Sequence, residues 1–182
     1  MPTKAAYGIA IDLGTTTIGF SLVDLATGQV ESCLSRMNSQ RIYGADVLSR
    51  IQSANEGHGD DLRRYAESDL TQGIKDLCKN RIQVSDIQHI VIAGNTTMCH
   101  LLRGYSCQTL GVAPFQPVSI KQEDFVQKGI AVTILPGASA FVGGDIISGI
   151  YGIREHMDAD EPWMLLDLSL IHISEPTRLA LI

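Results

Sequence analysis

One tight turn near the start of the chain carries the residue types that phosphate binding needs. An apolar run leads into one carboxylate, one glycine and three hydroxyls, in the order Asp12, Gly14, Thr15, Thr16 and Thr17. A glycine lets backbone N–H groups approach an anion without a Cβ in the way. Threonine hydroxyls can donate to phosphate oxygens, and Asp12 can hold a magnesium ion directly or through its waters. An ordinary β-hairpin turn rich in glycine and threonine would have the same residues.

A second turn of similar form follows an apolar segment near the middle of the chain. Residues 89–93 are predicted as a buried strand, and Gly94, Asn95 and Thr96 follow it and open a helix. A strand, a polar turn with glycine and a helix N-terminus in that order form a common anion-facing arrangement. Plain helix capping by Asn95 or Thr96 accounts for the same residues, so both interpretations stay open.

A third turn places two glycines before an acid. Gly143 and Gly144 permit close approach between the helix predicted over residues 146–154 and a ligand or strand. Asp145 is the one acid in a neighbourhood of small residues. It is either a cleft carboxylate that orients water or a metal ion, or a helix-cap or surface residue.

The elements that position these turns follow from hydrophobic periodicity and turn residues. Residues 7–12, 17–24 and 29–34 are predicted as three consecutive strands of an antiparallel meander. Apolar residues at three- and four-residue steps predict a helix over 60–80, with acids in its first turn and bases at its end. The remaining predictions are a helix over 44–55, a loop over 104–124, a strand over 130–135 and a helix over 146–154.

The bulk composition indicates a globular chain. It has 182 residues, of which 45% are hydrophobic and 19% charged, enough for a sizeable core. A net charge of −6 without a cluster of lysine and arginine argues against nucleic acid and membrane surfaces as partners. No apolar run is long enough to cross a bilayer and no export signal is recognisable, which predicts a cytoplasmic protein. The scattered Cys33, Cys78, Cys99 and Cys107 lack metal-site spacing, and we expect most of them to be reduced core thiols.

The last residues form a segment of a different kind. Residues 168–178 resemble the translation of a transposon-end adapter used to prepare sequencing libraries. We therefore expect residues 168–182 to be a non-native tail, with a genuine amphipathic terminus as the alternative. Just before them an apolar run ends in Asp167, as the opening strand ends in Asp12. A second phosphate-binding turn is expected to begin at Asp167.

Several sequence blocks together resemble the ATPase portion of the reductive activators of corrinoid proteins (RACo). This family belongs to the superfamily of acetate kinase, sugar kinases, Hsp70 and actin (ASKHA). The blocks occur in the family's order, at residues 8–17, 43–51, 93–98 with 101–102, 113–115, and 136–137 with 141–145. The first block is shared by the whole superfamily, and the others narrow the resemblance to the activators.

The resemblance implies an α/β, actin-like (ribonuclease H-like) fold whose two lobes close on ATP and Mg²⁺, incomplete at the C-terminus of this chain. Residues 1–83 would form the first actin-like subdomain and residues 84–167 the start of the C-terminal ASKHA domain. Asp12 and Asp145 are the catalytic candidates, and Asp12 the metal ligand. The residues expected to bind the nucleotide are Gly14, Thr15, Thr16, Thr17, Gly94, Asn95, Thr96, Gly143, Gly144 and Asp167.

The resemblance also implies an activity. Activators of this family couple ATP hydrolysis to reduction of an inactive cobalt(II) corrinoid to the cobalt(I) state needed for methyl transfer. The partners would be a corrinoid protein and an electron donor, and the full-length protein would form a homodimer. The family usually carries a four-cysteine [2Fe–2S] cluster in an N-terminal ferredoxin-like domain. This chain lacks that cysteine set, so the cluster is expected only in a domain outside it, and the chain alone is expected to be inactive.

Two other functions stay open. One is a small-molecule kinase of the same superfamily, in which Asp145 would serve as the base for a substrate hydroxyl. The other is a non-catalytic, actin-like nucleotide-binding module that works by assembly or by gripping a partner.

Overall fold

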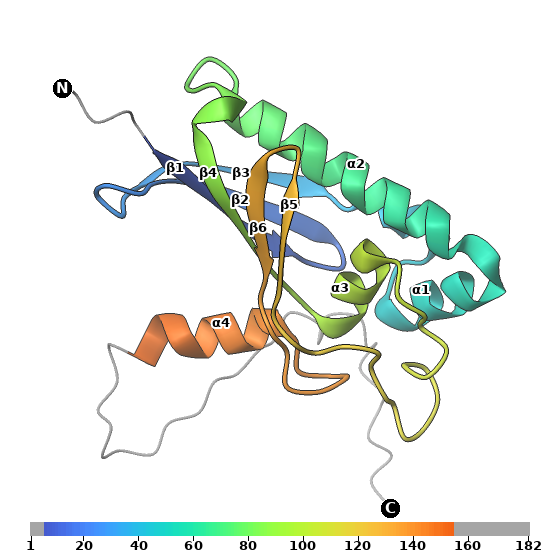
Figure 1. Cartoon of the computed structure of the whole chain (residues 1–182). Coiled ribbons are helices and arrows are strands. Elements are labelled where there is room, and N and C mark those ends of the chain that lie inside the picture. Colours follow the sequence, from blue (N-terminus) through green and yellow to red (C-terminus); the bar gives the residue numbers. More distant parts are fainter. Residues whose placement is uncertain (1–5, 155–182) are drawn as a thin grey trace, which may run out of the picture.

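A six-stranded mixed sheet forms the centre of the molecule, with the strand order β3-β2-β1-β4-β6-β5 (Figure 1). The structure is a computed structural model and describes residues 6–154. Asp167 and the predicted tail over residues 168–182 lie outside the described residues.

The first three strands form the predicted meander. Strands β1 (Tyr7–Leu13), β2 (Thr17–Asp24) and β3 (Val30–Met37) pair antiparallel in sequence order. Along β1 the burial alternates as a strand requires: Ile11 is buried, whereas Asp12 is exposed on the opposite face. The prediction of this meander is confirmed.

The second half of the sheet is mainly parallel. Strand β4 (Ile87–Gly94) pairs parallel with β1, and β6 (Ile130–Ile134) pairs parallel with β4. Strand β5 (Glu123–Gln127) pairs antiparallel with β6 at the edge. The loop predicted over 104–124 therefore runs into a strand that the sequence prediction missed. Because parallel strands point the same way, the carboxyl ends of β1, β4 and β6 lie at the same end of the sheet.

The helical segment after β3 begins later than predicted. Helix α1 spans Val47–Ser53 instead of 44–55, because the carboxylate of Asp46 accepts the Ser49 N–H at 2.8 Å and caps it. A kink at Gly57, with φ 104°, separates α1 from the long helix α2 (Gly59–Cys78). Short helical segments lie between these elements: η1 (Ser39–Tyr43), η2 (Ala54–His58) and η3 (Val84–Asp86).

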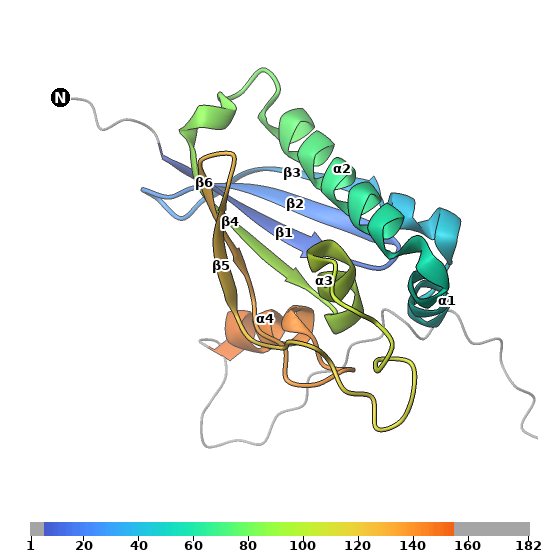
Figure 2. The ribbon, with the colours of Figure 1, turned by 45° about the vertical axis from the view of Figure 1, so that its right-hand side comes forward.

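The helices lie in separate places around the sheet. Figures 1 and 2 show α2 running along the sheet, with α3 (Thr96–Arg103) on the same side. Helix α4 (Gly144–Ile153) lies apart from α2 in both views. Leu62, Ala66 and Leu77 of α2 are buried with the apolar residues of the sheet, so this side holds the core. Within residues 6–154, no helix combines the length and apolarity that crossing a bilayer requires.

The observed sheet confirms the predicted α/β class. Strands from both sides of residue 83 belong to it, since β1, β2 and β3 precede that residue and β4, β5 and β6 follow it. The division of the chain into residues 1–83 and 84–167 stays a prediction.

Candidate phosphate-binding site

The three predicted turns meet at the end of the sheet where β1, β4 and β6 have their carboxyl ends. We call residues 14–17 the β1–β2 turn. The Asn95 side chain, just after β4, donates from Nδ2 to Thr15 Oγ1 at 3.0 Å and so touches this turn directly. A Cβ on Gly143, just before α4, would lie 2.5 Å from the Asn95 Cα. The structure thus brings together residues that are widely separated in the sequence.

Three successive carbonyl oxygens of the β1–β2 turn are held by hydrogen bonds from other parts of the chain. Asn38 holds two of its carbonyl oxygens, that of Gly14 through Nδ2 at 2.9 Å and that of Thr16 through its N–H at 2.9 Å. Arg50 Nη2 donates to the Thr15 carbonyl oxygen at 2.7 Å. In a trans peptide the N–H points opposite to the C=O, so the N–H groups that follow these carbonyls point away from the protein interior. In the part of the chain that the structure describes, the N–H groups of Thr15 and Thr16 have no protein acceptor.

Asn95 has two functions in this arrangement. Its Oδ1 accepts the Met98 N–H at 2.9 Å, which confirms helix capping as one role of this residue. Its Nδ2 holds the Thr15 hydroxyl. Thr96, by contrast, is buried and donates its hydroxyl to the Ser139 carbonyl at 2.7 Å. Its hydroxyl therefore holds the segment before α4 and does not contact the β1–β2 turn.

The glycines at the other two turns allow close packing of backbone. A Cβ on Gly94 would lie 2.9 Å from the Leu13 carbonyl oxygen, and one on Gly144 3.0 Å from that of Leu135. Gly94 thus lets the second turn pack against the end of β1, and Gly144 lets the start of α4 pack against Leu135, just after β6.

Asp12 faces away from α2. It lines a groove of about 380 Å³ on the opposite face of the sheet, together with Gly19, Ala93 and Ser148. Its carboxylate therefore lies near the end of β1, two residues before the β1–β2 turn, on an accessible face of the sheet.

Asp145 lies in the first turn of α4. Its Oδ1 accepts the Ile146 N–H at 2.9 Å, and its carbonyl oxygen accepts the Ser148 hydroxyl at 2.8 Å. Residues three apart share a helix face, so Asp145 stands on the side of α4 that reaches the groove through Ser148. Burial, with a contribution from the Asp145 charge, raises the pKa of the nearby Cys99 thiol to about 12. The catalytic role of Asp145 stays a prediction.

Sequence reasoning missed the polar residues behind the turn. Asn38, Gln40 and Arg50 are each 0% exposed. A signal for Arg50 was present in the sequence, since Val47 and Ile51 place the apolar stripe of α1 at helical steps around it. A cation on such a stripe indicates a buried polar network.

The described residues limit what metal chemistry this part of the chain can provide by itself. Within residues 6–154, no group of three or more His, Cys, Asp or Glu side chains is arranged to hold a metal ion. Cys78 and Cys107 are buried, and burial raises the pKa of both thiols, to about 11 for Cys107. A magnesium ion at Asp12 would take most of its ligands from phosphate oxygens and water, which is common for this ion.

Comparison with known proteins identifies the family. Residues 7–158 match the family model described as the RACo middle region. The chain belongs to the RACo family. It is 36% identical over 163 residues to the corrinoid activation enzyme RamQ of Eubacterium limosum, covering 82% of this chain and 27% of RamQ. The solved structure of a reductive activator for corrinoid, iron-sulfur protein is similar to this chain, with a TM-score of 0.80 and 32% identity, covering 87% of this chain and 27% of that one.

These comparisons confirm the resemblance stated from the sequence. The chain spans about a quarter of the length of both RACo relatives, at 27% each. The matched segment includes all three turns of the site and crosses residue 83 without a break.

Proposed function

We propose that this chain provides the first phosphate-binding lobe of an ATP-dependent activator that reduces corrinoid proteins. The hydrogen bonding of the β1–β2 turn carries this proposal. Three successive carbonyl oxygens, those of residues 14, 15 and 16, are bonded from the interior. The N–H groups of Thr15 and Thr16, together with the exposed side chains of Thr16 and Thr17, form a row of donors suited to phosphate oxygens.

Asp12 suits the role of magnesium ligand in this site. It precedes Thr15, the first residue of the row of donors, by three residues and lies on the face that carries the groove. Bound Mg²⁺ would neutralise charge on the phosphates and so favour attack by water on the terminal phosphorus. The products are ADP and phosphate. Ser148, which lines the same groove, and Asp145, whose carbonyl accepts the Ser148 hydroxyl, are the residues that would orient that water.

The lobe would act within a larger, actin-like protein. A second lobe, with a phosphate turn expected near Asp167, would close over the nucleotide, and closure would favour one complex with the corrinoid protein. A reduced donor, expected to hold the [2Fe–2S] cluster outside this chain, would pass one electron to cobalt(II) and give cobalt(I). The RACo relatives support this proposal through their names, which state corrinoid activation and reductive activation.

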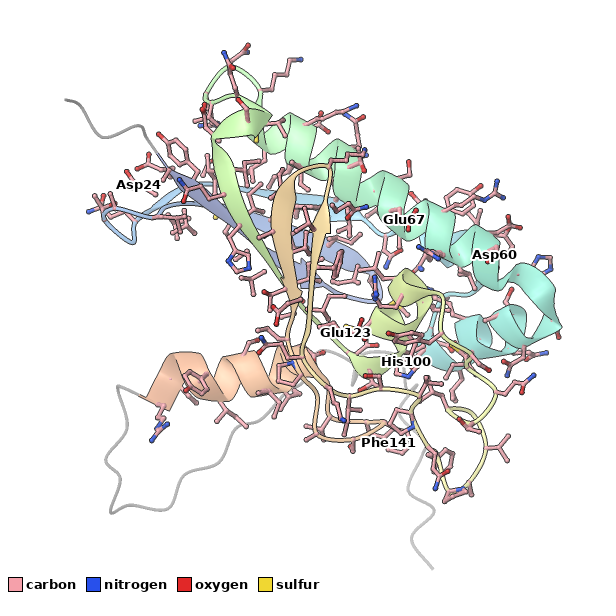
Figure 3. All side chains as sticks on the ribbon, viewed as in Figure 1. Asp24, Asp60, Glu67, His100, Glu123 and Phe141 are labelled. Carbon is pink, nitrogen blue, oxygen red and sulfur yellow. The ribbon has the colours of Figure 1, made fainter. Side chains whose placement is uncertain are left out.

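The test compares two substitutions in the full-length gene product. Asp12→Asn removes the carboxylate but keeps the size of the side chain, and we expect it to lower Mg-dependent ATP hydrolysis by about a hundredfold or more. Asp60→Asn is the matched control, because Asp60 is exposed at the start of α2 (Figure 3). ATP hydrolysis is followed by phosphate release, and cobalt reduction by the absorption change of an added corrinoid protein.

The outcomes separate the proposal from its alternatives. Hydrolysis that survives Asp12→Asn, or that is insensitive to removal of Mg²⁺ with a chelator, would contradict the role of Asp12. ATP-dependent phosphorylation of a small acceptor, without an effect on cobalt reduction, would favour a kinase instead.

A further inference from the structure

Arg50 is a buried cation that lies directly behind the β1–β2 turn. Its guanidinium donates through Nη2 to the Thr15 carbonyl at 2.7 Å and through Nε to the Gly44 carbonyl at 2.9 Å. Its Nη1 contacts Gln40 Oε1 at 3.4 Å and Met98 Sδ at 3.2 Å. These contacts join α1, η1, α3 and the turn, so Arg50 fixes the turn relative to three helical segments.

All of these acceptors are neutral. Among the residues that the structure describes, Arg50 forms no ion pair with a carboxylate. Burial lowers the pKa of its guanidinium to about 10, and the charge of Asp46 acts against that shift through space. The side chain therefore keeps its positive charge at neutral pH. A buried charge that is not paired directly with a carboxylate is costly to fold, and an anion bound outside the protein would offset part of that cost.

The positive charge and the row of donors act in the same direction. The carbonyl that Arg50 binds belongs to the same peptide unit as the Thr16 N–H, which points outward. A guanidinium on the inner side of that peptide raises the positive potential on its outer side, where an anion would lie. The effect grows with the number of negative charges on that anion.

We propose, building on the function proposed above, that Arg50 is a positioning residue whose buried charge makes the β1–β2 turn prefer a triphosphate over a diphosphate. Asn38 and Gln40 are its structural partners, because they fix the adjoining carbonyls and the guanidinium itself.

Two substitutions remove the net charge in different ways. Arg50→Gln deletes the cation, whereas Gln40→Glu keeps the guanidinium and places a carboxylate at the position that now accepts from Nη1. We expect each to lower the ATP:ADP affinity ratio roughly tenfold, the size of one unit-charge interaction across about 10 Å at an effective dielectric constant of about 20. Arg50→Lys keeps the charge and should keep the ratio within about threefold. Arg81→Gln, at an exposed arginine beyond α2, is the matched control and should leave the ratio unchanged.

The measurement is the affinity of the full-length gene product for ATP and ADP by calorimetry, and its thermal stabilisation by inorganic tripolyphosphate and pyrophosphate. If Arg50 had a purely structural role, its substitution would weaken the binding of ATP and of ADP equally. An unchanged ATP:ADP affinity ratio in Arg50→Gln and Gln40→Glu would therefore overturn this inference. The proposed function would still be supported in that case if the wild type binds ATP. Stabilisation by tripolyphosphate that both variants lose, without any nucleotide binding, would support the inference and contradict the proposed function. A wild type that responds to neither nucleotides nor polyphosphates would overturn both.

Discussion

Gly14 occupies a point in the β1–β2 turn where no side chain fits. A Cβ there would lie 2.4 Å from the Thr17 carbonyl oxygen, well inside van der Waals contact. The carbonyl of Gly14 is itself held by Asn38 at 2.9 Å. A methyl group at this position would therefore force the backbone of the turn to shift.

Replacing Gly14 by alanine tests whether this geometry is needed for phosphate binding. We expect Gly14→Ala to lower the free energy of unfolding by about 1–3 kcal/mol and to weaken ATP binding more than about tenfold. Urea unfolding and calorimetry measure the two effects. Gly59→Ala is the control, because a Cβ there would lie 3.8 Å from the Ala54 carbonyl oxygen, an ordinary contact. Equal ATP affinities in the two variants would contradict the assignment of the turn.

The residues of the site differ in how far they could be predicted from the sequence. Asp12 and the β1–β2 turn were recognised because carboxylate, glycine and hydroxyls follow one another directly. The place of Arg50 on the apolar stripe of α1 indicates that it is buried, but its contact with Thr15 could not be predicted, because that contact joins residues 35 positions apart. No local pattern reports such a contact. The approach of Asn95 to the same turn likewise depends on the parallel pairing of β1 and β4, which a single sequence does not specify.

At the scale of elements, α3 joins the end of β4 to the long loop before β5 through one histidine. His100 is 1% exposed, and its Nδ1 pairs with the Thr96 carbonyl at 2.7 Å. Its Nε2 accepts the Val118 N–H at 3.0 Å. This arrangement requires the neutral ring with its proton on Nδ1. Burial lowers the pKa of His100, against a smaller opposing effect of the Thr96 carbonyl and of Glu123, which is labelled with His100 in Figure 3.

We expect His100 to make the free energy of unfolding depend on pH. The unfolded chain takes up a proton near the ordinary pKa of 6.5, whereas the folded chain resists it, so the free energy of unfolding falls as the pH drops below 6.5. His100→Gln cannot be protonated and should lack this part of the slope, although it is less stable at every pH. Urea unfolding between about pH 7.5 and about pH 5 compares the two slopes. Parallel slopes in wild type and variant would show that His100 does not titrate on unfolding.

Long periodic elements were predicted well and short edge elements poorly. Helix α2 shows many repeats of its apolar spacing, and its observed bounds differ from the predicted ones by one or two residues. Strand β5 has five residues, is largely exposed and contains only Phe125 and Val126 as apolar members. It is a strand because its backbone forms hydrogen bonds with β6, and no sequence pattern predicts those hydrogen bonds. The cap at Asp46 explains why α1 starts later than its hydrophobic pattern suggests.

At the scale of the whole molecule, the sheet order explains where the site lies. Strand β1 is central because it pairs with β2, to which a short turn joins it, and with β4, which the chain reaches from β3 through a connection that contains α1 and α2. The meander could be predicted from short turns between successive strands, and the α/β class from the alternation of strands and helices. The neighbours of β4 and β6 could not, since crossover connections allow several strand orders.

The same order leaves β3 and β5 as the two edges of the described sheet. On β5, Val126 is 72% exposed. It also lines an apolar groove of about 330 Å³ between α2 and the β5–β6 pair, with Leu70, Ile74 and Val132 among its walls. An edge strand with free backbone groups and exposed apolar side chains favours pairing with another copy. We therefore expect the 182-residue chain to self-associate through β5.

Lysine substitutions at two exposed valines test this expectation. Val126→Lys places a charge on the edge strand and should shift the mass of the chain toward the monomer, measured by size exclusion with light scattering at several concentrations. Val112→Lys changes a valine that is 65% exposed in the loop before β5 and should leave the mass unchanged. Both substitutions reduce the net charge of −6 by one unit, which by itself weakens repulsion between copies. A shift toward the monomer in Val126→Lys alone must then come from the edge, whereas equal masses for all three chains would exclude β5 as the contact.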